Sequence, residues 1–292
     1  MESSGLVSMI RYGKTEEIAL LYGMFSRLDK SFELLRTHIK DYIQDEGSKL
    51  VQDEKLKNEE LVVRLIEQRE RINDLHVKAM QKDNQIDLTI KMSFEKVVNT
   101  SNRTAKALVF YLDDMFKKDF KTIHESELHE KLDKVIQIFR YLLDKDVFEG
   151  FYVNSFAKRL LDQRHICEDA ERALVLKLKE ECGFQFTQRL EVMFKDMKMS
   201  DELTSEFKTK PACSTLSVEL NVKVLTSGHW PNDGKEQQQQ VATMPPEISL
   251  AMASFTQFYF SKYNQGRQLN WKLSLGSAEL RGNFGQKMRY EF

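Results

Sequence analysis

Apolar residues recur at three- and four-residue spacings through the first two thirds of the chain, which is the period of amphipathic helices. Between residues 15 and 121 the pattern predicts five helices with short polar joints, and no proline occurs before Pro211. Helices that cannot bury their apolar stripes alone predict a stacked helical repeat. The stripes are Ile18, Leu21, Tyr22, Phe25 and Leu28; Leu34, Leu35, His38, Ile39, Tyr42 and Ile43, closing near Gly47; Leu61, Val62, Leu65, Ile66, Arg69 and Ile72; Ile86, Ile90, Phe94, Val97 and Val98; and Leu108, Tyr111, Leu112, Met115 and Phe116.

The same period continues over residues 122–207 and predicts a bundle of four helices. In the second of them, Lys158 and Arg159 are expected to face solvent, where they form a small positive patch with Arg164. The third has acidic residues in its first turn and Gly183 just past its last, as helix termini favour. The apolar positions are Leu132, Val135, Ile136, Phe139, Leu142 and Leu143; Val147, Phe148, Phe151, Tyr152, Phe156 and Leu160; Ala170, Ala173, Leu174, Leu176 and Leu178; and Leu190, Met193, Phe194 and Met197.

After Phe207 the period changes to two. Apolar and polar residues alternate over residues 216–225 and again over residues 268–275, with shorter alternating runs up to the last residue. Such alternation places one set of side chains on a single sheet face, and the short turns between runs predict an antiparallel meander. A helix over residues 246–259 separates the runs. Residues 208–292 are therefore predicted to be α+β, in a chain that is mainly α.

Composition excludes several classes of protein. The net charge is −1, so the protein as a whole produces no positive electrostatic field that would attract nucleic acid or an anionic membrane. Basic residues are also not interleaved with exposed aromatic residues, as a nucleic-acid-binding surface would require. No run of about 18 apolar residues predicts a membrane span. The beginning of the chain does not resemble a signal peptide, which predicts a cytosolic or nuclear location. The three cysteines, Cys167, Cys182 and Cys213, form no CxxC pair and are predicted to be reduced structural thiols.

No constellation of residues predicts catalysis, a metal site or a cofactor. The histidines are scattered, and only His124 and His129 lie near each other, on a polar segment without further ligands. Phosphate-binding and nucleophile-elbow motifs are absent. Asp113–Asp114 and Glu180–Glu181 are predicted to be solvated because adjacent helical residues diverge. Cys182 as a thioester-forming nucleophile would need a lowered pKa, which a helix C-terminus disfavours.

The predicted strands raise a different possibility. An exposed edge presents unpaired backbone N–H and C=O groups, which a partner strand can satisfy while it buries alternate side chains. A sheet closed by the chain's own strands is an equally good interpretation of the residues alone.

Several stretches of the chain resemble the cullins, the scaffolds of multi-subunit ubiquitin ligases. The resemblance is carried by DVFEGFY, AKRLL, DAER, KLKEECGFQFT and LEVMFKDM within residues 146–197, and by TSGHWP, PPEI, GRQLNW and LGSAEL further on. LYGMFSRL and SFEKVVN resemble the last N-terminal cullin repeat less closely. GRQL and LGSAEL are nearer cullin-3, and PPEI and LNW are nearer cullin-4.

The resemblance implies three parts: a cullin repeat over residues 1–121, a four-helix bundle over 122–207 and an α/β domain over 208–292 that is cut before the winged-helix domains. It also implies a non-catalytic scaffold in which a RING-box protein inserts a strand into the sheet, so that a ubiquitin-charged conjugating enzyme (E2) is recruited indirectly. A substrate adaptor would bind only if earlier repeats existed. The implied seat for the RING strand consists of Val218, Leu220, Val222, Val224, Trp230, Leu269, Trp271 and Leu273.

Two other interpretations stay open. One is a truncated or diverged cullin-like interaction module without ligase assembly, because the chain resembles only a middle slice of the family. The other is a ubiquitin-transferring enzyme that uses Cys182.

Overall fold

A computed structural model describes residues 5–118, 125–162, 168–214, 216–231, 244–263 and 266–273, together with the backbone of residues 281–284 and 288–291. The chain is mainly helical and forms two compact units. The first comprises residues 1–199 and 223–237, and the second comprises residues 200–222 and 238–292. The predicted domain boundaries at residues 121 and 207 stay predictions.

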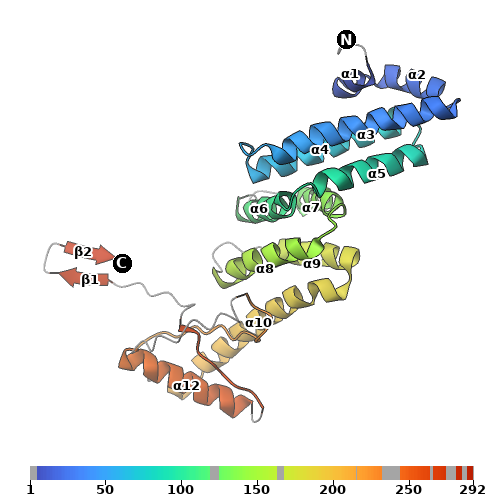
Figure 1. The fold of residues 1–292 in the computed structure, drawn as a ribbon. Helices are drawn as coiled ribbons and strands as arrows, with labels where there is room; N and C mark the ends of the chain where they lie inside the picture. The colour runs from blue at the N-terminus through green and yellow to red at the C-terminus, as the bar shows by residue number, and fades with distance from the viewer. Residues whose placement is uncertain are drawn as a thin grey trace. The chain divides into compact units, whose positions relative to one another are not determined.

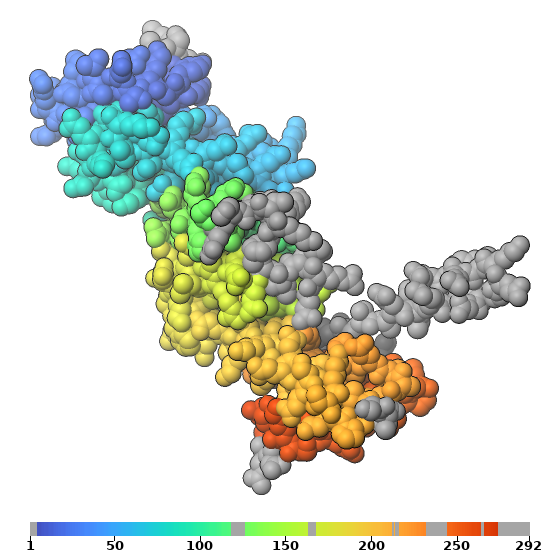
Figure 2. All heavy atoms as spheres, turned by 180° about the vertical axis from the view of Figure 1, so that it is seen from behind, coloured from blue at the N-terminus to red at the C-terminus, as the bar shows by residue number. Residues whose placement is uncertain are grey.

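The first unit is a succession of helical layers (Figure 1). Helices α1 and α2 lie at one end, the long helices α3, α4 and α5 follow, and α6 and α7 and then α8 and α9 come next. Figure 2 shows the same succession from the opposite side, from blue through green. The helices are α1 (Leu6–Arg11), α2 (Thr15–Phe25), α3 (Asp29–Gln52), α4 (Asn58–Ala79), α5 (Asn84–Val98), α6 (Arg103–Lys118), α7 (Glu125–Phe139), α8 (Lys145–Asp162) and α9 (Glu168–Cys182).

Most positions of the predicted apolar stripes form the core of these layers, but Leu34, Leu143, Phe151 and Leu176 are exposed, contrary to the prediction. Ile18, Ile39 and Phe94 are buried together between α2, α3 and α5. Farther along, α8 carries a run of stacked rings in which Phe148 and Tyr152 lie 5.6 Å apart and Tyr152 and Phe156 5.8 Å apart, measured between ring centroids. Aromatic rings bury large apolar areas, so this run anchors the second half of the first unit.

Two predicted details of the first helices are wrong. Leu28 was placed in the apolar stripe of α2, but α2 ends at Phe25 and Leu28 is 64% exposed. Helix α3 does not close near Gly47 and continues to Gln52. Gly47 is buried where α3 crosses α5, and a Cβ atom there would lie 2.6 Å from Cγ1 of Val97. The glycine therefore permits a close helix crossing and does not end the helix.

This crossing makes Gly47→Ala a destabilising substitution. Val97 is fully buried and β-branched, so it cannot turn away from a new methyl group without moving the backbone. We expect a loss of about 1–3 kcal/mol of unfolding free energy, as for other overpacked sites. The matched control is Gly150→Ala on α8, where nothing lies within 4 Å of the new Cβ. There, the higher helix propensity of alanine is expected to add up to about 1 kcal/mol. Urea titrations followed by circular dichroism measure both changes, and equal effects at the two sites would contradict this account.

Helix α10 (Phe184–Lys208) begins in the first unit and ends in the second. Gly183, with φ +84°, separates it from α9 and donates its N–H to the carbonyl of Lys179 at 2.8 Å, as predicted for a C-terminal glycine. In the second unit, Phe207 of α10 packs against Phe255 and Phe258 of α12 (Pro246–Lys262). The short helix α11 (Pro211–Ser214) lies between them in sequence.

The predicted antiparallel meander is not confirmed as a whole. Residues 216–226 and 266–272 are described and belong to no strand. Strand β1 (Arg281–Phe284) pairs antiparallel with β2 (Met288–Glu291), with Phe284 opposite Met288. This ladder joins the last two alternating runs, as a meander would. Residues 274–280, which the prediction also assigned to strands, lie outside the described residues.

Candidate functional site

The residues of the predicted RING seat are divided between the two units. In the first unit, the segment around Trp230 is fastened to α10 by one carboxylate. Asp196 accepts hydrogen bonds from the backbone N and Oγ1 of Thr226, both at 2.7 Å, and from Nε1 of Trp230 at 2.8 Å. Asp196 is 2% exposed. A buried carboxylate needs such donors to offset its lost hydration, so this cluster fixes where the segment lies.

Trp230 itself belongs to the helical core. It is 5% exposed and packs in the same buried cluster as Phe194 and Met197 of α10. Arg189 adds a hydrogen bond from its Nε to the carbonyl of His229. The resemblance to cullins implied that Trp230 belongs to the seat of the RING strand. In the described residues it anchors residues 226–230 to helices, and its role next to a partner strand stays a prediction.

In the second unit, residues 216–222 keep the alternation that the sequence predicted, without forming a strand. Val222 is buried and Val218 and Leu220 are half-buried, whereas the residues between them are exposed. Oγ1 of Thr204 donates to the carbonyl of Val222 at 3.1 Å, and Lys208 pairs with Glu219 at 2.8 Å. The C-terminal turns of α10 therefore hold this segment from one side.

The residues around Trp271 lie against α12. Nε1 of Trp271 donates to Oγ1 of Thr256 at 3.2 Å, and its ring meets the ring of Phe255 edge-on, with the centroids 6.1 Å apart. Leu269 is half-buried, and Leu273 is 41% exposed. Helix α12 thus takes the place that the prediction gave to a neighbouring strand. A segment that buries every second side chain can pack against a helix as well as against a strand. Whether these residues seat a RING strand stays a prediction.

Sequence reasoning missed a buried ionic cluster in the first unit. Arg159 was predicted to face solvent, as part of a small positive patch with Lys158 and Arg164. Lys158 is exposed and Arg164 lies outside the described residues, but Arg159 is 6% exposed. It donates from Nε to Glu171 of α9 and from Nη1 to Asp113 of α6 at 2.6 Å. The expectation of a solvated face is wrong for Arg159 and for Asp113.

The cluster is closed by Tyr152, whose hydroxyl donates to Oε2 of Glu171 at 2.6 Å. Burial, together with the charge of Glu171, raises the pKa of Tyr152 well above its usual value. Burial would raise the pKa of Asp113, but hydrogen bonds from Lys117 and Arg159 outweigh it, so that pKa is lowered. The raised pKa keeps Tyr152 neutral at neutral pH, and the lowered pKa keeps Asp113 charged. The cluster therefore ties α6, α8 and α9 together and offers no proton for transfer.

Cys182 lacks the surroundings of a nucleophile. It is half-buried at the end of α9, and burial raises the pKa of its thiol even though the charge of Lys145 lowers it. A raised pKa leaves little thiolate at neutral pH. Among the described residues, no group of three or more His, Cys, Asp or Glu side chains is placed to hold a metal ion. No helix in the described ranges is long and apolar enough to span a membrane.

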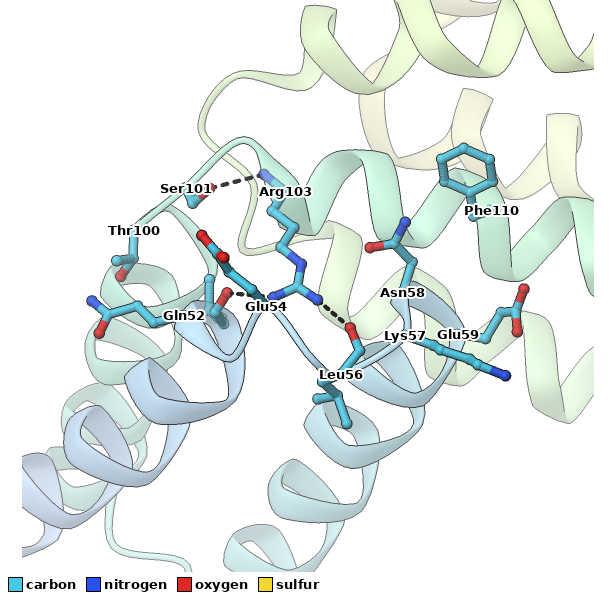
Figure 3. A pocket seen from close by; sticks show the side chains of 11 residues that line it. Gln52, Glu54, Leu56, Lys57, Asn58, Glu59, Thr100, Ser101, Arg103 and Phe110 are labelled. Atoms are coloured by element: carbon cyan, nitrogen blue, oxygen red, sulfur yellow. Dashed lines mark hydrogen bonds between the residues drawn. The ribbon is translucent and has the colours of Figure 1, made fainter.

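A pocket of about 740 Å³ opens where the α3–α4 connection meets the start of α6 (Figure 3). Arg103 crosses this region and donates to three backbone carbonyls, those of Val51 at 3.0 Å, Asp53 at 2.7 Å and Leu56. Its guanidinium is therefore occupied in holding the connection and is not free to bind an anion. The charged residues that line the rest of the pocket, Glu54, Lys57 and Glu59, are of both signs.

Comparison with known families assigns both parts of the chain. Residues 1–204 match the cullin α-solenoid domain, and residues 224–292 match the cullin α+β domain. The chain belongs to the cullin family. The resemblance found in the sequence motifs is thereby confirmed.

Individual cullins align with nearly the whole chain. Cullin-3 of Dictyostelium discoideum is 37% identical over 98% of this chain and 37% of its own length. Cullin-3B of Arabidopsis thaliana is 36% identical over 100% of this chain and 39% of its own length. Cullin-4 of Dictyostelium discoideum is 33% identical over 97% of this chain and 34% of its own length. The chain thus spans between about a third and two fifths of the length of these relatives.

Proposed function

We propose that this chain is a scaffold segment of a cullin-RING ubiquitin ligase, in which the second unit receives a strand of a RING-box protein. The RING protein would recruit the ubiquitin-charged E2. The chain would raise the effective concentration of the thioester near a substrate lysine. No residue of the chain needs to touch the reacting bond, in agreement with the unreactive surroundings of Cys182.

One observation carries this proposal. Residues 216–222 present alternate apolar side chains, are held by α10 from one side, and belong to no strand in the described part of the second unit. An added strand pairs with such a backbone and gains specificity from its alternate side chains. Val218, Leu220 and Val222 would line one flank of the seat. Leu269 and Leu273, next to the anchored Trp271, are proposed for the other.

Co-expression with a RING-box protein, followed by affinity capture, tests the proposal. Val222→Asp is expected to abolish capture because it places an unpaired charge in a buried position. Leu220→Asp, at a half-buried position, is expected to reduce capture at least tenfold with less risk to the fold. The matched control is Asn221→Asp, which adds the same group on the exposed side of the segment and should leave capture unchanged.

Circular dichroism of each variant separates lost binding from lost folding. A folded Leu220→Asp variant that captures the RING protein as well as the unmodified chain would remove the proposed seat. If the unmodified chain captures no RING protein, the scaffold function itself is wrong, and the interpretation as an interaction module without ligase assembly takes its place.

A further inference from the structure

Helix α2 presents an apolar stripe that nothing in the described part of the chain covers. Leu20 is 71% exposed and Met24 is 69% exposed, at the i, i+4 spacing that places both on one helix face. Buried Ile18 and Tyr22 occupy the opposite face and join α2 to the core. The exposed pair is therefore not needed for folding of the unit.

Charged residues of opposite sign lie at the two ends of this stripe. Glu16 and Glu17 lie in the first turn of α2, whereas Arg27 follows shortly after the helix ends. Glu17 makes one exposed ion pair with Lys14 at 3.6 Å, a contact of small energetic value. Arg27 makes no hydrogen bond or ion pair with the residues that the structure describes. One end of the stripe is thus acidic and the other basic.

We propose that α2 pairs antiparallel with α2 of a second copy of this chain, about a two-fold axis level with Tyr22. Residues equally far on either side of the axis then face each other. Leu20 faces Met24 of the second copy, each two residues from the axis, and Glu17 faces Arg27, each five residues from it. Both contacts occur twice, which is the self-complementarity that an isologous interface requires.

A small residue lies beside the proposed helix crossing. Gly23 borders the stripe, and no atom lies within 4 Å of the position a Cβ would take. A small residue there lets two helix axes approach to the usual distance of about 8–10 Å. The face offers only two strongly exposed apolar side chains, Leu20 and Met24, whereas a standard interface has about 20–30 residues per partner. The dimer is therefore weak, and this proposal is independent of the RING seat.

Sedimentation velocity and light scattering of the full chain, from about 5 to about 500 µM, test the pairing over the range of weak complexes. The unmodified chain is expected to shift from monomer to dimer. Leu20→Gln combined with Met24→Gln should weaken association at least tenfold, because glutamine keeps the helix but removes the apolar contact. The matched control is Leu88→Gln with Met92→Gln on α5, an exposed pair at the same spacing (55% and 63% exposed). It should leave association unchanged.

A charge exchange tests the antiparallel register. Glu17→Lys and Arg27→Glu should each weaken association by about two- to fivefold, as expected for exposed pairs. The double variant should regain the unmodified affinity because the pair is restored with its signs reversed. A chain that stays monomeric at every concentration overturns the proposal and leaves the face to another partner. A dimer that the α5 control weakens, or that the double variant fails to restore, overturns it as well.

Discussion

Glu171→Ala is expected to cost the protein about 3–5 kcal/mol of unfolding free energy, which is the usual penalty for removing one partner of a buried ion pair. The carboxylate accepts from Nε of Arg159 and from the hydroxyl of Tyr152 in a site where both side chains are almost fully buried. After substitution, Arg159 would keep Asp113 alone, and among the described residues its Nη2 already has no hydrogen-bond partner. The positive charge would remain buried because its guanidinium cannot lose a proton.

The matched control for this variant lies on the same helix. Glu168 pairs with Arg172 four residues later, and both side chains are at least half exposed. Glu168→Ala is expected to change stability by no more than about 0.5 kcal/mol. Urea unfolding followed by helical circular dichroism compares the two, with the slope checked for a change in the denatured state. Losses of similar size would show that the buried cluster contributes no more than a surface pair.

A second comparison separates the cost of an orphaned charge from the value of the whole cluster. Arg159→Met together with Glu171→Leu removes both charges and fills the site with apolar atoms. Such replacements are often neutral or stabilising, so the double variant should recover most of the stability that Glu171→Ala loses. The hydroxyl of Tyr152 would then lack its acceptor, which limits the recovery.

The burial of Arg159 marks the limit of what helical periodicity predicts. The spacing of Phe148, Tyr152 and Phe156 correctly placed the apolar face of α8. Arg159 lies three residues after Phe156, at a spacing shared with the buried face, but its charge favoured solvent in the prediction. Its burial depends on carboxylates contributed by two other helices, Asp113 of α6 and Glu171 of α9, which lie 46 and 12 residues away in the sequence. A local pattern carries no information about such partners.

The helices were predictable for the opposite reason. Each apolar stripe is a local signal repeated over several turns, and buried positions such as Ile39, Phe94 and Leu174 follow from it directly. Gly47 shows the exception: glycine often ends a helix, yet here it serves a crossing with Val97. That contact joins residues fifty positions apart, so the local pattern could not reveal it.

For the candidate seat, the sequence predicted which side chains alternate between buried and exposed. It did not predict which element packs against them. Val218, Leu220 and Val222 are more buried than the residues between them, as the period of two requires. The alternation does not specify whether a strand or a helix supplies the contact, and in the structure α10 holds this segment. The role of Asp196 was also missed, since a single acidic residue in a helix gives no sign that three donors converge on it.

Asp196→Ala is expected to release the segment that Trp230 anchors, at a cost of about 2–4 kcal/mol. The substitution leaves the indole N–H of Trp230 and the backbone N–H of Thr226 without their acceptor. Unsatisfied buried donors cost about 1–3 kcal/mol each, and relaxation of the segment toward water recovers part of that cost. Asp196→Asn, which keeps one acceptor oxygen and removes the charge, should lose less. The matched control is Lys195→Ala, at the exposed neighbouring position on α10, which should lie within about 0.5 kcal/mol of the unmodified chain.

Tryptophan fluorescence in a Trp271→Phe background reports on this release, because Trp230 is then the only indole in the chain. In the Asp196→Ala variant we expect the emission to shift to longer wavelength and quenching by acrylamide to increase, while most helical circular dichroism is retained. The reason is local: Asp196 holds residues 226–230 through side-chain contacts, whereas the helices of the first unit keep their own core. An unchanged spectrum with unchanged quenching would mean that apolar packing alone holds Trp230 and that the carboxylate does not position the segment.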